Sequence, residues 1–135
     1  PVAPPGFGSF AHGEAVAHAH IAAVDHGRRG ANYLLGGTDA SFLTLLQTVA
    51  ELAHTRIQPG FAVPAPGFRL AGRLGGVWGA LTRRDPGLTP EAAAILCARS
   101  RIVSDRARVE LGLHHPDLDT MVADAYWWLR RHGLA

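Results

Sequence analysis

Proline and glycine interrupt this sequence throughout, and they limit what it can fold into more than any other feature. The chain has 135 residues, of which 16 are glycine and 9 are proline. Proline removes a backbone donor and clashes with the preceding helical turn, whereas glycine inside a helix costs about 1 kcal/mol relative to alanine. The sequence therefore predicts a compact, loop-rich fold of elements separated by many turns.

The rest of the composition is that of a folded protein. Hydrophobic residues make up 47% and charged residues 18% of the chain, which lies outside the low-hydrophobicity, high-charge signature of disorder. The length favours one domain or a piece of one, with a modest core. No fixed-period repeat, low-complexity tract or interdomain linker is recognisable. We therefore expect residues 1–135 to form a single domain or fragment.

Membrane and export signals are missing from these residues. No apolar run approaches the roughly 20 residues that a transmembrane helix needs. The opening PVAPPGFGSF has neither the charged n-region nor the apolar h-region of a signal peptide. Cys97 is the single cysteine, which excludes an internal disulfide and a multi-thiolate zinc site. We expect a cytoplasmic protein that does not bind membranes.

The charge distribution argues against nucleic acid as a partner. All 13 basic residues are arginine, and the net charge is only +2. Nucleic-acid-binding proteins usually concentrate positive charge on one face. Here the arginines are spread over the whole chain, from Arg28 to Arg130.

Apolar periodicity and capping residues predict a mostly helical chain. The expected helices are Glu14–His26 with Gly27 as a left-handed cap, one capped by Ser41 and running to Ala53, Phe68–Leu81, Thr89 to about Ala98, Ser104 to Gly112, and one opened by Asp117 and ended at His132-Gly133. Four glycines in the Phe68–Leu81 segment indicate close contact with another backbone. The small-residue face of the first helix suits packing against a sheet.

Strands are expected at two or three places. Residues 31–35, closed by Gly36-Gly37, resemble a short strand and a tight turn, and the proline-rich stretch 57–66 suits an edge strand. Helix, strand and helix thus alternate within about forty residues, an order typical of α/β folds. The sequence predicts a mostly helical α/β fold with two or three short strands.

A search for catalytic groups finds no convincing motif. The eight histidines lack the spacing of metal ligands: His18 and His20 are two apart and diverge on a helix, as do the neighbours His114 and His115. Cys97 lies in an apolar helical stretch, where a buried hydrophobe is the favoured role. Asp117 and Asp119 match helix-start charges and Asp124 a polar face. Gly36-Gly37 lacks the G-x-G-x-x-G pattern of nucleotide-binding loops.

Three stretches carry a resemblance to one enzyme family. The first is Ser9 to Gly37, SFAHGEAVAHAHIAAVDHGRRGANYLLGG, which resembles a segment of the extended short-chain dehydrogenase/reductases without a gap. In that segment a strand of the type N-[FL]-V-H-V-D-D leads into a V-A-x-A-x-x-x-A helix, which is followed by G-x-x-G-x-x-Y-x-[LI]-G-G. RIVSDRARVELGL resembles S-x-K-A-x-x-E-L-G-[YW], with Arg106 in place of lysine. LDTMVADAYWWLRRHGLA resembles the closing amphipathic helix.

The resemblance is greatest to the dihydroflavonol-reductase and hopanoid-associated sugar-epimerase branches of this NAD-dependent epimerase/dehydratase family. It implies the C-terminal, substrate-binding portion of a Rossmann-type enzyme that uses NAD(P) on a sugar nucleotide or a small carbinol or ketone. It also places Ser9, Phe10 and His12 near the substrate, with strand packing as their alternative role. Substrate would then be a small molecule.

The family's catalytic half has no counterpart in these residues. In the family, a Tyr-x-x-x-Lys pair protonates the substrate oxygen and a glycine-rich Rossmann turn holds the cofactor. This chain has no lysine; Tyr33 is followed four residues later by Gly37 and Tyr126 by Arg130. We therefore predict no catalytic residue and no cofactor bound by this chain alone, and the partner would be the missing N-terminal cofactor domain.

A non-enzymatic role is the alternative. In it the chain is a vestigial remnant of the family, or a protein-interaction module whose apolar helical surface docks a partner protein or a second copy as a homodimer.

Overall fold

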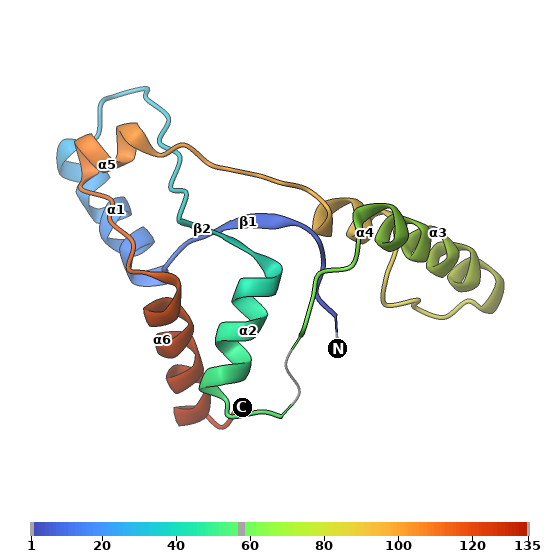
Figure 1. The fold of residues 1–135 in the computed structure, drawn as a ribbon. Helices are drawn as coiled ribbons and strands as arrows, with labels where there is room; N and C mark the ends of the chain where they lie inside the picture. Colours follow the sequence, from blue (N-terminus) through green and yellow to red (C-terminus); the bar gives the residue numbers. More distant parts are fainter. Residues whose placement is uncertain (1, 57–58, 135) are drawn as a thin grey trace. The chain divides into compact units, whose positions relative to one another are not determined.

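The computed structural model describes residues 2–56 and 59–134. It shows a mixed α/β fold that is mostly helical, as predicted, with a two-stranded sheet in which β1 and β2 are antiparallel. Figure 1 shows the elements, which in chain order are β1 (Phe7–Phe10), α1 (Gly13–His26), β2 (Thr38–Ser41), α2 (Phe42–Leu52), α3 (Ala65–Thr82), α4 (Pro90–Leu96), α5 (Asp105–Leu111) and α6 (Leu118–Arg131).

The chain divides into two compact units. The first comprises Pro1–Gly8 and Ser41–Arg99, and the second comprises Ser9–Ala40 and Ser100–Ala135. The first unit thus holds α2, α3 and α4, and the second holds α1, α5 and α6. Among the helices that the structure describes, none is long and apolar enough to cross a membrane.

In the first unit, α3 packs against α4 (Figure 1). The glycines of α3 lie against α4 and the loop that precedes α4. A Cβ atom added at Gly72 would lie 2.5 Å from the Ala93 Cβ, and one at Gly75 would lie 2.3 Å from the Leu88 carbonyl oxygen. The predicted close contact with another backbone is therefore confirmed. The large apolar residues of α3 are instead exposed, namely Leu70, Leu74, Val77, Trp78 and Leu81.

In the second unit, α1 packs against α5 (Figure 1). The buried cluster consists of Ala19, Ala107, Leu111 and Leu113. Ala19 and Ala107 are 2% and 0% exposed, so the two helices approach closely through alanine side chains. The predicted small-residue face of α1 is confirmed, but it lies on a helix rather than on a sheet.

Both predicted strands differ from the structure. Residues 31–35 form no strand, and β2 lies later, at Thr38–Ser41. In that loop the Ala31 N–H donates to the Arg28 carbonyl, and Leu34 is exposed, so no neighbouring strand satisfies this backbone. Of the expected edge strand over 57–66, residues 57 and 58 lie outside the described residues. The remainder holds a single bridge, Ala62 to Ala3, before α3 begins at Ala65.

Most helix ends follow their predicted caps. The side chains of Ser41, Thr89 and Asp117 accept hydrogen bonds from backbone N–H groups three residues later. Gly112 ends α5 with a φ of 67°, in the left-handed region that favours glycine. Gly27 is different: its φ is −67° and its N–H donates to the Ala23 carbonyl, so the prediction of a left-handed cap there was wrong.

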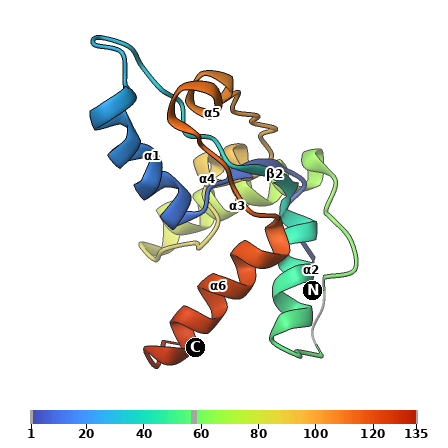
Figure 2. The same cartoon turned by 90° about the vertical axis from the view of Figure 1, so that its left-hand side faces the viewer.

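The last helix buries only its beginning. Met121 and Val122 are buried, whereas Trp127, Trp128 and Leu129 are 52%, 51% and 37% exposed. In Figure 2, α6 continues away from α5 to the C-terminal end of the chain. The apolar stripe predicted for this helix is therefore covered by the second unit along its first turns alone.

Candidate functional site

The three residues predicted to line a substrate pocket lie at the end of β1 and the start of α1. Ser9 and Phe10 are half-buried residues of β1, and His12 precedes the first turn of α1 as its N-cap. The side chain of His12 makes no capping hydrogen bond to α1, so its imidazole is available for other contacts.

Ser9 is engaged by the segment that leads into β2. Its hydroxyl accepts a hydrogen bond from the Gly37 N–H at 2.9 Å and lies 3.3 Å from the Gly37 carbonyl oxygen, to which it donates. A Cβ at Gly37 would lie 1.8 Å from the Phe10 carbonyl oxygen, so only glycine permits this approach. Ser9 thus holds two backbone segments together.

His12 joins three elements of the second unit. Its Nε2 lies 3.2 Å from the Asp124 carboxylate on α6, and its backbone N–H donates to His115 Nδ1 at 3.1 Å. Asp124 is largely exposed, so this contact contributes at most about 1 kcal/mol to stability. Its effect is to orient the imidazole of His12 rather than to hold the fold.

A groove of about 440 Å³ opens between the start of α1 and the face of α6. Its lining residues are Ala11, His12, Gly13, Glu14, Met121, Asp124, Ala125 and Trp128. The volume falls within the range of about 300–1,000 Å³ that is typical of small-molecule sites. Of the three predicted residues, His12 lines this groove, and neither Ser9 nor Phe10 is among its lining residues. A substrate-binding role for the three remains a prediction.

The groove combines one exposed aromatic surface with three polar side chains. Trp128 stacks on His132 with ring centroids 4.2 Å apart, and Glu14 and Asp124 supply carboxylate acceptors beside the His12 imidazole. No arginine is among the lining residues. This arrangement can bind a neutral, hydroxyl-bearing ring through hydrogen bonds and apolar contact, and it offers no arginine to a phosphate.

A separate network fixes the loop after α1 to α5. Arg28 and Tyr33 both hydrogen-bond to the Glu110 carboxylate, Arg28 through Nε at 3.0 Å and Tyr33 through its hydroxyl at 2.5 Å. The Tyr33 oxygen also accepts from the Arg28 backbone N–H at 2.9 Å. Arg28 first, and then Tyr33, lower the pKa of Glu110 from 4.5 to about 2. Tyr33 is therefore committed to a structural contact.

The other residues considered as catalytic candidates make structural contacts instead. Cys97 is buried, with its sulfur 3.9 Å from the Ala65 carbonyl oxygen, as expected of a small core residue. Asp117 caps α6, and the hydrogen bond from the Thr120 backbone lowers its pKa. Tyr126 accepts a 3.4 Å hydrogen bond from Arg130. Within residues 2–56 and 59–134, no group of three or more His, Cys, Asp or Glu could hold a metal ion.

Comparison with known proteins gives a structural match. No protein-family model matches the chain, and no curated protein matches its sequence. A solved structure described as the crystal structure of gox2253 is similar, with a TM-score of 0.70 and 25% sequence identity. The similarity covers 96% of this chain and 40% of the other chain. This chain therefore spans less than half the length of the structure that it matches.

Sequence reasoning missed the two residues that contact His12, namely Asp124, which lines the groove, and His115, which does not. His12 and Asp124 are far apart in the sequence, and His115 is 103 residues from His12, so no local spacing brings them together. Asp124 was interpreted as a polar-face residue and His115 as an ordinary histidine. The sequence offered one indication: neither Asp124 nor His115 caps or begins a helix, so neither side chain had a local structural role assigned to it.

Proposed function

We propose that this chain is the substrate-binding portion of an NAD(P)-dependent oxidoreductase or epimerase of the extended short-chain dehydrogenase/reductase type. Its substrate would be a sugar nucleotide or a small carbinol or ketone. The nicotinamide cofactor and the tyrosine and lysine that move the proton would lie in residues outside this sequence. In this proposal the fold is the C-terminal portion of a Rossmann-type enzyme.

One structural observation carries the proposal. The three stretches that resemble the family are 9–37, 101–113 and 118–135, and all three belong to the second compact unit. There α1 packs on α5, and His12 connects the end of β1 to α6. Segments that were matched separately along the sequence therefore meet as one unit, which is expected if they derive from one ancestral substrate-binding fold.

The structural match is consistent with this role. Nearly the whole chain superposes on 40% of the gox2253 chain, so an equivalent of this fold exists as part of a larger protein. The groove at His12 adds a chemical argument, because a tryptophan, two carboxylates and an imidazole suit a hydroxyl-bearing ring. We assign the sugar or carbinol moiety of the substrate to this groove.

The decisive test is the coding sequence immediately upstream of Pro1. We expect it to encode, in the same frame, a glycine-rich Rossmann fingerprint and a Tyr-x-x-x-Lys pair. In a fluorescence titration, the protein that includes those residues should bind NADH or NADPH, and residues 1–135 alone should not. A tight one-to-one complex of residues 1–135 with either nucleotide would contradict the assignment of cofactor binding to other residues. An upstream frame without either motif would favour the interaction-module alternative.

A variant tests the groove itself. In the protein that includes the upstream residues, His12→Ala should raise KM for the best substrate of a panel of sugar nucleotides and aryl ketones, with the dissociation constant for NADPH unchanged. We expect an increase of about tenfold, the effect of losing one oriented hydrogen bond. His18→Ala on the exposed side of α1 is the matched control. Equal effects of the two substitutions would contradict a groove-specific role.

A further inference from the structure

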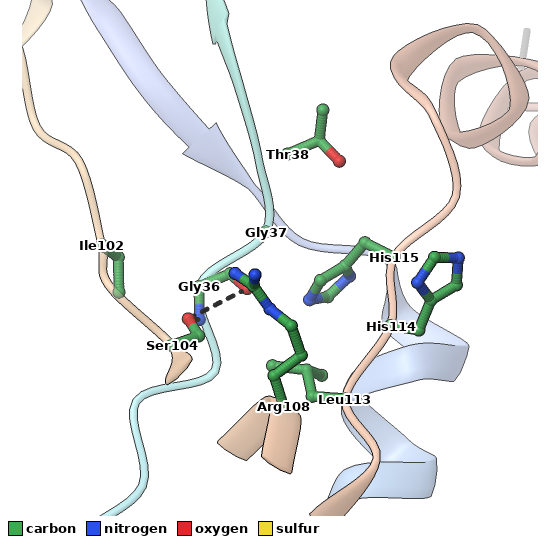
Figure 3. Close-up of a pocket in the computed structure, with 9 residues that line it drawn as sticks. All are labelled: Gly36, Gly37, Thr38, Ile102, Ser104, Arg108, Leu113, His114 and His115. Carbon is green, nitrogen blue, oxygen red and sulfur yellow. Dashed lines mark hydrogen bonds between the residues drawn. The ribbon is translucent and has the colours of Figure 1, made fainter. Parts of the chain in front are cut away.

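An apolar groove runs along α3 in the first unit. It has a volume of about 440 Å³, and its lining holds no charged side chain: Leu74, Gly75, Val77, Trp78, Leu81 and Pro86. A cavity of about 220 Å³ in the second unit is different, because polar side chains line it and the Gly36 N–H donates to the Ser104 hydroxyl there (Figure 3). The groove on α3 therefore offers apolar contact rather than hydrogen bonds.

The groove is part of a longer apolar stripe on α3. Five large residues make up this stripe and recur with the 3.6-residue period of a helix: Leu70, Leu74, Val77, Trp78 and Leu81. Each is between 56% and 78% exposed, and together they extend over about 16 Å at 1.5 Å per residue. The opposite face of α3 lies against α4 and the loop before it, through Gly72 and Gly75. Since α4 lies behind the helix, it leaves the stripe exposed.

Positive charge borders the stripe. Arg69 and Arg73 lie one turn apart in α3, Arg83 is its C-cap and Arg84 follows, and all four are exposed. Positions 52–84 contain no acidic residue. Among the residues that the structure describes, none of the four arginines forms an ion pair. Asp85, the next acidic residue along the chain, accepts a hydrogen bond from the Gly87 N–H. Unpaired guanidinium groups thus flank the stripe and follow its end.

An apolar helix face flanked by basic residues is typical of a helix that lies in the plane of a membrane interface. Tryptophan is enriched at the level of the lipid headgroups, and guanidinium groups form strong hydrogen bonds with phosphate. The charge of an anionic lipid surface is therefore complementary to that of α3.

Two other partners fit this face less well. A second copy of the chain would bring the same arginines together, and neither stripe holds a carboxylate to pair with them. Protein interfaces usually carry about one hydrogen bond per 100–200 Å², whereas the indole N–H of Trp78 is the one polar side-chain group in the stripe. A lipid bilayer requires no such directional contacts from the apolar side chains.

We propose that α3 lies on a membrane surface that contains anionic lipid, with its apolar stripe at the boundary of the acyl chains and its arginines paired with lipid phosphates. The proposal does not depend on the enzymatic role, because α3 belongs to the first unit and the groove at His12 to the second. It departs from the sequence-based expectation that the chain does not bind membranes. That expectation rested on the lack of a spanning segment, which an interfacial helix does not need.

Vesicle flotation tests the proposal, because vesicles rise through a density gradient with the protein that they bind, whereas aggregated protein sinks. We expect residues 1–135 to float with vesicles of phosphatidylcholine and phosphatidylglycerol, but not with vesicles of phosphatidylcholine alone. Added salt should weaken the binding, because it screens the charges. Failure to float with the anionic vesicles would overturn the proposal and favour a protein as the partner of this face. Equal flotation with both kinds of vesicle would also overturn it, because the arginines would then contribute nothing.

One pair of variants tests the apolar stripe. Leu74→Glu introduces a carboxylate at a position that is 62% exposed, so it should abolish flotation and leave the circular dichroism spectrum unchanged. Val24→Glu, at a position on α1 that is 85% exposed, is the matched control and should float as the wild type does. Unchanged flotation of Leu74→Glu, or an equal loss in Val24→Glu, would contradict binding through this stripe.

A second pair tests the arginines. Arg73→Gln should lower the partition coefficient for the anionic vesicles by about fivefold, the contribution expected of one basic residue near such a surface. Arg29→Gln, at an exposed position in the loop after α1, removes the same charge and should change the partition coefficient little. Equal effects of the two substitutions would show that net charge alone drives the binding, and the proposal would be wrong.

The protein that includes the residues upstream of Pro1 distinguishes a membrane surface from an internal contact. We expect this longer protein to float with the anionic vesicles as well. Flotation of residues 1–135 without flotation of the longer protein would overturn the proposal, because the upstream residues would then cover the stripe.

Discussion

At the scale of single residues, Ser104 occupies a capping position but uses its side chain for a distant contact. Its position before α5 is that of an N-cap, yet its side chain makes no capping hydrogen bond. The hydroxyl instead accepts from the Gly36 N–H, 68 residues away in the sequence. Ser104 is 4% exposed, so its hydroxyl stabilises the fold by accepting a hydrogen bond from the Gly36 N–H, a donor that would otherwise be buried without a partner.

We therefore expect Ser104→Ala to lower the free energy of unfolding by about 1–3 kcal/mol, the cost of leaving a buried N–H unpaired. Urea denaturation followed by circular dichroism measures the change. Ser100→Ala, at an exposed position in the same connecting segment, should change stability by less than about 0.5 kcal/mol. A Ser104→Ala protein as stable as the wild type would show that water replaces the hydroxyl.

At the scale of elements, α3 is a helix whose glycines are required by its neighbour. Alanine normally stabilises a helix relative to glycine by about 1 kcal/mol. At Gly75 the new Cβ would lie 2.3 Å from the Leu88 carbonyl oxygen, which is a backbone atom that moves only with its loop. The steric cost therefore outweighs the propensity gain.

Gly75→Ala should accordingly destabilise the chain by about 1–3 kcal/mol, as overpacking does. Gly67→Ala in the same helix is the matched control, because its Cβ would meet nothing nearer than a Val63 methyl group at 3.8 Å. That substitution should be neutral or stabilise by up to about 1 kcal/mol. Thermal denaturation of both variants checks the pair, and opposite signs are the expected result.

The loop after α1 depends on the ionisation of Glu110. Its pKa is about 2 in the folded chain against a reference value of 4.5, so the unfolded chain binds a proton more readily than the folded chain. The stability that it contributes is present above pH 4.5 and is lost as the pH falls toward 2. Glu110→Gln should remove this pH dependence, as followed by denaturant midpoints between pH 5 and 2.5. Glu91→Gln, at an exposed position in α4, should retain it.

At the scale of the whole molecule, the two groups with the clearest titration effects both lie in the second unit. His115 has a pKa below its reference of 6.5, so its contribution is present above pH 6.5 and declines as the pH falls below that value. Glu110 follows below pH 4.5.

Acid should consequently loosen the second unit before the first. At pH 5 we expect the amides of α5 to lose more hydrogen-exchange protection, relative to pH 7.5, than the amides of α4, once both are corrected for intrinsic exchange rates. His115→Asn should abolish the difference. Equal loss of protection in the two helices of the wild type would refute the localisation.

The sequence by itself determined where the helices lie and most of their boundaries, although α3, expected over Phe68–Leu81, begins at Ala65. Ser41, Thr89, Asp117 and Gly112 act through hydrogen bonds or backbone conformations within a few residues, so their effects can be predicted without knowledge of distant contacts. The mostly helical α/β class followed from the same periodicity. The glycines of α3 also indicated a close neighbour, although not which one.

Only the tertiary structure decided where the strands and the candidate sites lie. Residues 31–35 were expected to form a strand before the Gly36-Gly37 turn but form none, whereas Thr38–Ser41 pairs with β1. The contacts of His12 with Asp124 and His115 join residues more than a hundred positions apart. A strand or a site of this kind is a property of pairs of distant segments, and no periodicity within either segment specifies its partner.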